Sequence, residues 1–159
     1  MGSTWRPDDS MLKRSAKGQY RAAQRVRDAL RRNKIDAKDR ITTSRDKGMA
    51  AAQRSLKRTQ MPRGVEQWQL PLAQPLDFLM VTITRMKPGV VVPTHSHQVW
   101  VFRFIAQGSL KYGKTTLKAL DWMLVPPNQP YSISAGPEGC TVLYGHCGPV
   151  GPPPPGPPG

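Results

Sequence analysis

The chain has 159 residues, which is enough for one domain of ordinary size with extensions but short for two independent hydrophobic cores. It contains no run of eighteen apolar residues and begins with polar and charged residues, so we expect neither a membrane-spanning segment nor a secretory signal peptide. The formal charge of +14 is uneven, because residues 1–64 hold 18 Lys and Arg against 6 Asp while residues 65–159 hold 6 against 4 acidic residues, which predicts a basic arm ahead of a near-neutral body.

The first predicted element is a helix that begins near Asp8 and continues to Asn33, since Asp and Ser cap helices well and good helix formers follow. Its apolar residues form one narrow stripe, from Leu12 to Leu30, that is suited to packing on another surface. Cations fill much of the remaining circumference, and we expect them to contact a polyanion or a partner protein. They are Lys13, Arg14, Lys17, Arg21, Arg25, Arg31 and Arg32.

A second and weaker helix is predicted from Asp36 or Ser44 to Thr59, where Gly48 weakens its middle and Pro62 prevents its continuation. The arm, residues 1–64, has only Trp5 and Tyr20 as aromatic residues. It therefore has little apolar surface with which to offset its ordering entropy, and alone it should be only partly helical.

From Val65 the pattern changes to period two with frequent turn signals, which is typical of short strands in a sandwich or barrel. Residues 65–147 are therefore predicted to form one mainly β domain. Its expected strands are Gln67–Leu72, Leu76–Met86, Val99–Ile105, Ser109–Tyr112, Thr115–Leu117, Trp122–Val125, Tyr131–Ser134 and Thr141–Tyr144. Residues 148–159 are rich in Pro and Gly and predict a polyproline-like tail.

Two segments resemble the conserved motifs of the cupin superfamily: residues 88–97, which contain His95 and His97, and residues 121–131, which end at Tyr131. The resemblance covers about half of the chain and implies a cupin-type jelly-roll barrel. In metal-binding cupins a His-x-His pair, a Glu and a later His hold the ion. His95 and His97 match the first two ligands, whereas the Glu falls at Val101 and the last His at Tyr131.

These departures leave the metal site incomplete. Two imidazoles are fewer than the three or four protein ligands of ordinary zinc sites, and the oxygen-activating irons add a carboxylate to two His. By strand alternation Val101 and Arg103 should both face the barrel interior, where a fixed cation would oppose a metal ion. We therefore expect no cofactor, with a divalent metal held by His95, His97 and Tyr131 as the alternative.

Three functions are compatible with these features. The first is a non-enzymatic assembly protein, such as a bacteriophage virion component, whose arm docks on neighbouring subunits or on nucleic acid without sequence specificity. The second is a metal-dependent cupin enzyme, a dioxygenase or isomerase. The third is a metal-free ligand-binding or regulatory cupin in which Arg103 and Tyr131 hold an anionic ligand. The first predicts an oligomer, located in a virion or in the cytoplasm.

Overall fold

The computed structural model describes residues 5–74 and 76–149, so the predicted tail lies outside the described residues from position 150 onward. The chain divides into two compact units. The helical unit comprises residues 5–36 and 48–74 of the described chain, and the β unit comprises residues 37–47 and 76–149.

The helical unit contains a short 3-10 helix at Asp9–Leu12 (η1) followed by α1 at Arg21–Arg32 and α2 at Met49–Ser55. The predicted continuous helix up to Asn33 is therefore wrong for the segment between η1 and α1. Gly18 there adopts a left-handed conformation with φ +74°, which interrupts a right-handed helix. The backbone N–H of Gly18 instead bonds to the carbonyl of Ser15 at 2.9 Å and closes a turn.

Both helices bury small and apolar side chains in this unit. Val26, Ala29 and Leu30 of α1 and Met49 and Ala52 of α2 are buried. Of the predicted apolar stripe, Val26 and Leu30 are buried, whereas Leu12 at its start is exposed. Within residues 5–74 and 76–149, no helix is long and apolar enough to cross a bilayer.

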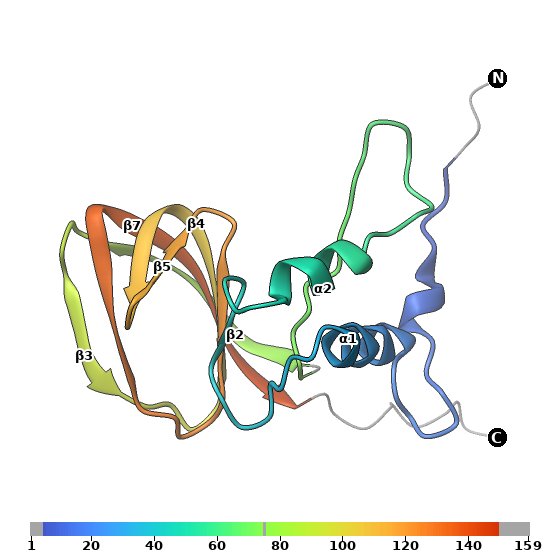
Figure 1. Ribbon diagram of the computed structural model, residues 1–159, viewed down its shortest axis with the longest axis horizontal. Helices are drawn as coiled ribbons and strands as arrows, with labels where there is room; N and C mark the ends of the chain where they lie inside the picture. Colours follow the sequence, from blue (N-terminus) through green and yellow to red (C-terminus); the bar gives the residue numbers. More distant parts are fainter. Residues whose placement is uncertain (1–4, 75, 150–159) are drawn as a thin grey trace. The chain divides into compact units, whose positions relative to one another are not determined.

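The β unit is a seven-stranded antiparallel sheet with the path β1-β6-β4-β7-β2, to which β3 is added on β7 and β5 on β4 (Figure 1). The mainly β fold preceded by a helical segment is thus confirmed. The strands are β1 (Thr42–Thr43), β2 (Leu76–Met86), β3 (Val91–His95), β4 (Trp100–Tyr112), β5 (Thr115–Lys118), β6 (Trp122–Val125) and β7 (Tyr131–Pro149). Of the expected strands, Gln67–Leu72 is absent, while β4 and β7 each unite two that were expected separately.

One difference from the expected barrel concerns closure, because the sheet is not closed. The two ends of its path are β1 and β2, and these strands pair only with β6 and β7 respectively among the strands described. The two residues of β1 offer too short an edge to pair with the eleven residues of β2.

One face of the sheet carries the core of the β unit. Its buried members are Val101, Ile105, Leu110, Leu117, Met123, Val125, Tyr131, Ile133, Ala135, Cys140 and Val142. The segment of residues 37–47 belongs to this unit although it lies within the predicted arm. Asp121 holds it there, accepting hydrogen bonds from the Ser44 hydroxyl at 3.0 Å and from Arg45 Nε at 2.7 Å.

Candidate functional site

Three strands bring polar and aromatic side chains together at one end of the core-bearing face. We call this group the His–Tyr–Arg cluster, and its members are His95, His97, Arg103, Tyr131, Tyr144 and His146. The register explains the grouping: Arg103 of β4 lies opposite Tyr144 of β7, and His95 of β3 lies opposite Tyr131 of β7. Since side chains two residues apart share a face, His146 joins Tyr144 on β7.

The Arg103 guanidinium is the centre of the cluster. The residue is only 7% exposed and donates a hydrogen bond to the Tyr131 hydroxyl. Its guanidinium carbon lies 4.2 Å from the ring centroid of Tyr144 and 5.2 Å from that of Tyr131. No Asp or Glu in the described part of the chain forms an ion pair with it. Arg stays charged, and cation–π contacts offset only part of the penalty of burying an ion without a counter-ion.

The three histidine rings lie near Arg103, and His97 is nearly perpendicular to both His95 and His146. The ring centroids of His95 and His97 are 4.9 Å apart, and those of His97 and His146 are 5.3 Å apart. The Tyr144 hydroxyl lies 2.9 Å from His97 Nε2, and His95 Nδ1 lies 2.8 Å from the Pro93 carbonyl oxygen. Nδ1 of His146 is buried and has no hydrogen-bond partner among the residues described. This nitrogen could therefore form a hydrogen bond with a bound ligand or water molecule.

Burial sets the protonation of the cluster. Desolvation, together with the nearby His95, Arg103 and His146, lowers the pKa of His97, so this imidazole is neutral at pH 7. Burial raises the pKa values of Tyr131 and Tyr144 although Arg103 acts in the opposite direction, so both phenols keep their protons. The cluster therefore presents the fixed positive charge of Arg103, neutral hydroxyl groups and at least one neutral imidazole.

The three residues expected to hold a metal, His95, His97 and Tyr131, lie close together. The rings of His95 and Tyr131 lie 4.7 Å apart. Yet within residues 5–74 and 76–149 no three His, Cys, Asp or Glu side chains are placed to hold an ion. Val101, at the position of the family's Glu, is fully buried in the core and offers no oxygen ligand. The buried charge of Arg103 would also repel a cation.

Tyr144 and His146 belong to the cluster but are absent from the set expected from the sequence. The signal for them is the period-two spacing of Tyr144 and His146 in one strand. That spacing places both side chains on one face of β7. Their proximity to His97 depends on the pairing of β7 with β3 and β4, which the spacing does not specify.

The seven predicted cations of the arm differ in their surroundings. Lys13, Lys17, Arg21 and Arg32 are exposed and form no ion pair with any described residue. Arg31 is exposed but pairs with Asp28 at 2.9 Å, whereas Arg14 and Arg25 are half-buried. Arg14 donates to the Tyr20 hydroxyl at 2.6 Å, and Arg25 Nη1 lies 3.9 Å from Met11 Sδ. Four of the seven are therefore free to meet a polyanion.

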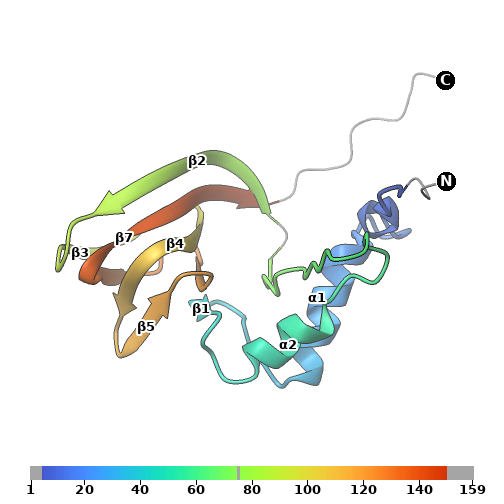
Figure 2. The ribbon, with the colours of Figure 1, turned by 90° about the horizontal axis from the view of Figure 1, so that it is seen from above.

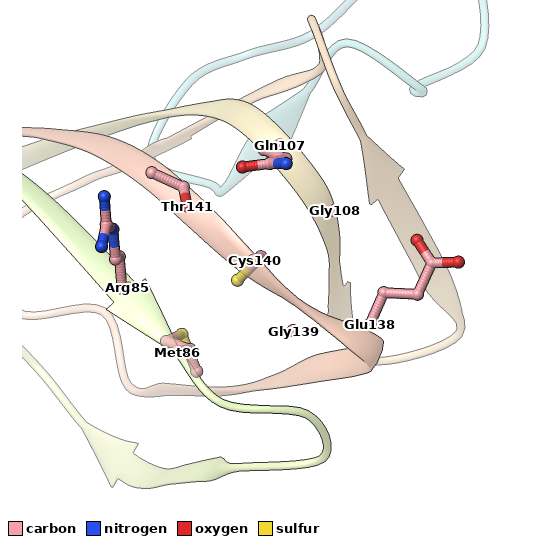
Figure 3. A pocket seen from close by; sticks show the side chains of 8 residues that line it. All are labelled: Arg85, Met86, Gln107, Gly108, Glu138, Gly139, Cys140 and Thr141. Carbon is pink, nitrogen blue, oxygen red and sulfur yellow. The ribbon is translucent and has the colours of Figure 1, made fainter.

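A second pocket of about 270 Å³ is lined by residues of β2, β4 and β7, none of which belongs to the cluster (Figure 3). It is lined by Arg85, Met86, Gln107, Gly108, Glu138, Gly139, Cys140 and Thr141. Gly108 and Gly139, with φ +75° and +74°, let the strands approach closely: a Cβ on Gly108 would lie 2.1 Å from the Gly139 carbonyl oxygen. A side chain at Gly108 would therefore force the backbones of β4 and β7 apart beside the pocket.

No protein-family model matches the chain, and no curated protein matches it. It is similar to several solved structures. One is a Ralstonia eutropha JMP134 protein of unknown function with a cupin-like fold, at 19% identity and a TM-score of 0.41, covering 45% of this chain and 48% of that chain. The cupin domain of Schizosaccharomyces pombe Cnp3 has 22% identity and a TM-score of 0.38, with 46% and 63% covered. The complex of Rhodobacter sphaeroides SigE with the anti-sigma ChrR has 18% identity and a TM-score of 0.39, with 42% and 36% covered. The matched region thus spans less than two thirds of each of these structures, and the similarity is one of fold.

Proposed function

We propose that the β unit is a binding module for a small anionic ligand, which it holds at the His–Tyr–Arg cluster without a metal ion. One observation carries this proposal: Arg103 is buried and has no carboxylate partner among the described residues. An anionic ligand would supply the missing counter-ion, and a charge-assisted hydrogen bond to a guanidinium is among the stronger polar contacts.

The rest of the cluster complements such a ligand. The Tyr131 and Tyr144 hydroxyls beside Arg103 keep their protons, and Nδ1 of His146 is buried without a hydrogen-bond partner among the described residues. They could donate to, or accept from, a carboxylate or phosphate and its hydroxyl substituents. The cluster contains no acidic residue that would repel an anion. The Tyr144 hydroxyl lies 2.9 Å from His97 Nε2, but burial raises the pKa of this phenol and makes it a poor nucleophile. Binding is therefore favoured over catalysis.

Thermal and urea unfolding with inorganic phosphate or citrate as probes test this proposal. A ligand that binds only the folded protein raises its free energy of unfolding, by about 2.7 kcal/mol when present at 100 times its dissociation constant. We expect one or both probes to stabilise the wild type but not Arg103→Met. Lys111→Met is the matched control, because Lys111 is an exposed cation on the same strand and should leave the response intact.

Two results would count against the proposal. Equal responses of wild type and Arg103→Met would assign any anion effect to the general positive charge, and no response to either probe would remove the support for an anion site. Stoichiometric metal in the purified protein, lost in the His95→Ala/His97→Ala variant, would favour the metal-dependent alternative instead.

We propose as a second function that the helical unit docks on a polyanion, such as nucleic acid, or on the acidic surface of a neighbouring subunit in an assembly. Its described residues hold 14 Lys and Arg against 5 Asp and Glu. The exposed Lys13, Lys17, Arg21 and Arg32 form no ion pair within the described chain. Contacts to phosphates by such cations give affinity that falls steeply with salt.

Binding of mixed-sequence duplex DNA and RNA, measured across a salt series, tests this second function. The variant Lys13→Gln/Lys17→Gln/Arg21→Gln/Arg32→Gln should weaken binding and reduce the salt dependence. The control Lys111→Gln/Lys114→Gln/Lys118→Gln removes exposed charges from the β unit and should change binding less. Unchanged binding in the four-residue variant would contradict the proposal. Recovery of the chain as a stoichiometric component of purified phage particles would support the virion form of the assembly hypothesis.

A further inference from the structure

The aromatic side chains of the helical unit lie outside its core. In the described part of the unit they belong to Trp5, Tyr20 and Trp68, and none of these residues is buried. Trp5 is 45% exposed and Trp68 is 38% exposed. Trp is highly buried on average and is enriched at interfaces, so two exposed Trp rings on a strongly basic unit indicate a contact surface.

Trp5 and Trp68 are both held by the loop that follows α2, residues 57–68. At the base of this loop Lys57 and Trp68 form an isolated antiparallel bridge. Farther along the loop, the Gln60 carbonyl oxygen accepts a hydrogen bond from Trp5 Nε1 at 3.0 Å. Figure 1 and Figure 2 both show the N-terminal segment beside this loop. We call Trp5 together with residues 57–68 the Trp loop.

Cations accompany the exposed rings of the Trp loop. Lys57 Nζ lies 5.3 Å from the ring centroid of Trp68. Lys57 also pairs with Glu66 at 2.6 Å, but both side chains are well exposed, so this ion pair contributes little stability and a phosphate could replace the carboxylate. The neighbouring Arg6 and Arg63 are exposed and form no ion pair with any described residue. Positive charge therefore lies close to both Trp rings.

Exposed rings beside cations select one kind of polyanion. Single-stranded nucleic acid offers unpaired bases that stack on aromatic side chains and phosphates that pair with cations, whereas the bases of a duplex are stacked on one another. We propose that the helical unit binds single-stranded nucleic acid and that bases stack on Trp5 and Trp68. This inference rests on the polyanion function proposed above, which it narrows to one class of partner.

Fluorescence anisotropy of labelled oligonucleotides at one fixed salt concentration tests the preference for single strands. Oligo(dT) and oligo(U) of 15 nucleotides should both bind the full chain more tightly than a 15-base-pair duplex. Electrostatics alone would favour the duplex, because its phosphates are more closely spaced. Stacking should also quench the tryptophan emission of the protein as the oligonucleotide binds.

Substitutions in the Trp loop test the role of the rings. Trp5→Ala and Trp68→Ala should each raise the dissociation constant for oligo(dT) about fivefold or more and leave duplex binding within about twofold of the wild type. Trp68→Phe keeps an aromatic face and should retain most of the affinity. Val65→Ala is the matched control, because Val65 is an exposed apolar residue of the same loop without an aromatic ring. Circular dichroism shows whether each variant is folded.

The failure of this inference is distinguishable from failure of the polyanion function. Unchanged oligo(dT) binding in both alanine variants would overturn base stacking, and so would a duplex that binds more tightly than both oligonucleotides. The polyanion function itself fails if neither form of nucleic acid binds, or if the variant Lys13→Gln/Lys17→Gln/Arg21→Gln/Arg32→Gln binds as tightly as the wild type. If an alanine variant does not fold, wild-type emission that saturating oligo(dT) leaves unchanged would overturn the inference.

Discussion

The guanidinium carbon of Arg103 lies 4.2 Å from the ring centroid of Tyr144, directly across the β4–β7 ladder. The same ring carries the hydroxyl that meets Nε2 of His97 at 2.9 Å. One tyrosine thus connects the buried cation with the histidines. The aromatic faces and hydroxyls offset part of the free-energy penalty of burying this charge. An anion beside the guanidinium would offset more of it.

Replacing Arg103 by Met should make the ligand-free protein more stable. Met fills most of the same volume without a buried charge, and such replacements are often stabilising, here by about 1 kcal/mol. Urea unfolding in a buffer without phosphate or polycarboxylates measures the change. If Arg103→Met instead lowers the free energy of unfolding by about 2 kcal/mol or more, the contacts of Arg103 with the tyrosines already outweigh the cost of burying its charge. That result would remove the reason to expect an anionic ligand.

Stability should fall in alkaline solution because of Tyr131 and Tyr144. Burial raises the pKa of both phenols in the folded protein, whereas in the unfolded chain they lose their protons near pH 10. The folded state therefore binds more protons, so its advantage is present below pH 10 and is lost as the pH rises through the raised pKa values. Unfolding midpoints between pH 8 and pH 11 measure this loss. The double variant Tyr131→Phe/Tyr144→Phe should show a shallower decline, and an identical decline would assign the effect to other groups.

Gly108→Ala should destabilise the β unit far more than Gly89→Ala. Both glycines have positive φ, +75° and +71°, so each substitution carries a similar backbone penalty of roughly 1 kcal/mol. A Cβ at Gly108 would also collide with the Gly139 carbonyl oxygen, whereas nothing lies within 4 Å at Gly89. We expect Gly108→Ala to lower the free energy of unfolding by about 3 kcal/mol or more, as measured by chemical unfolding. Equal losses would mean that the strands separate easily at this point.

Asp121→Ala should weaken the attachment of residues 37–47 to the sheet. Asp121 accepts hydrogen bonds from Ser44, from Arg45 and from the backbone N–H of Lys118 at 2.8 Å. Removing its carboxylate should lower the free energy of unfolding by about 2 kcal/mol. Arg45→Ala removes only a half-exposed ion-pair partner and should cost less than about 1 kcal/mol. Hydrogen exchange at Thr42 and Thr43 of β1 should accelerate in the first variant. Unchanged exchange there would show that other contacts hold this segment.

The sequence alone determined the parts that depend on local pattern. Alternation over Leu76–Met86 predicted β2 with its observed bounds, and the same alternation around Val101 and Arg103 predicted inward-facing side chains at two positions that are buried in the structure. The spacing of His95 and His97 predicted neighbouring imidazoles. For Val101 and Arg103 the reason is that the side-chain direction of a strand repeats every two residues whatever its partners are. His97 lies two residues beyond the end of β3, so its place beside His95 also depends on the loop that follows.

The tertiary structure decided which strands are neighbours, and this could not be predicted from spacing. Pairing of β7 with both β3 and β4 adds Tyr144 and His146 to the cluster, and the segment around Ser44 joins the β unit through Asp121, 77 residues away. The free edge of β2 follows from the same pairing pattern. Contacts between residues far apart in sequence depend on the burial of the whole core and not on local preference, so only the folded chain specifies them.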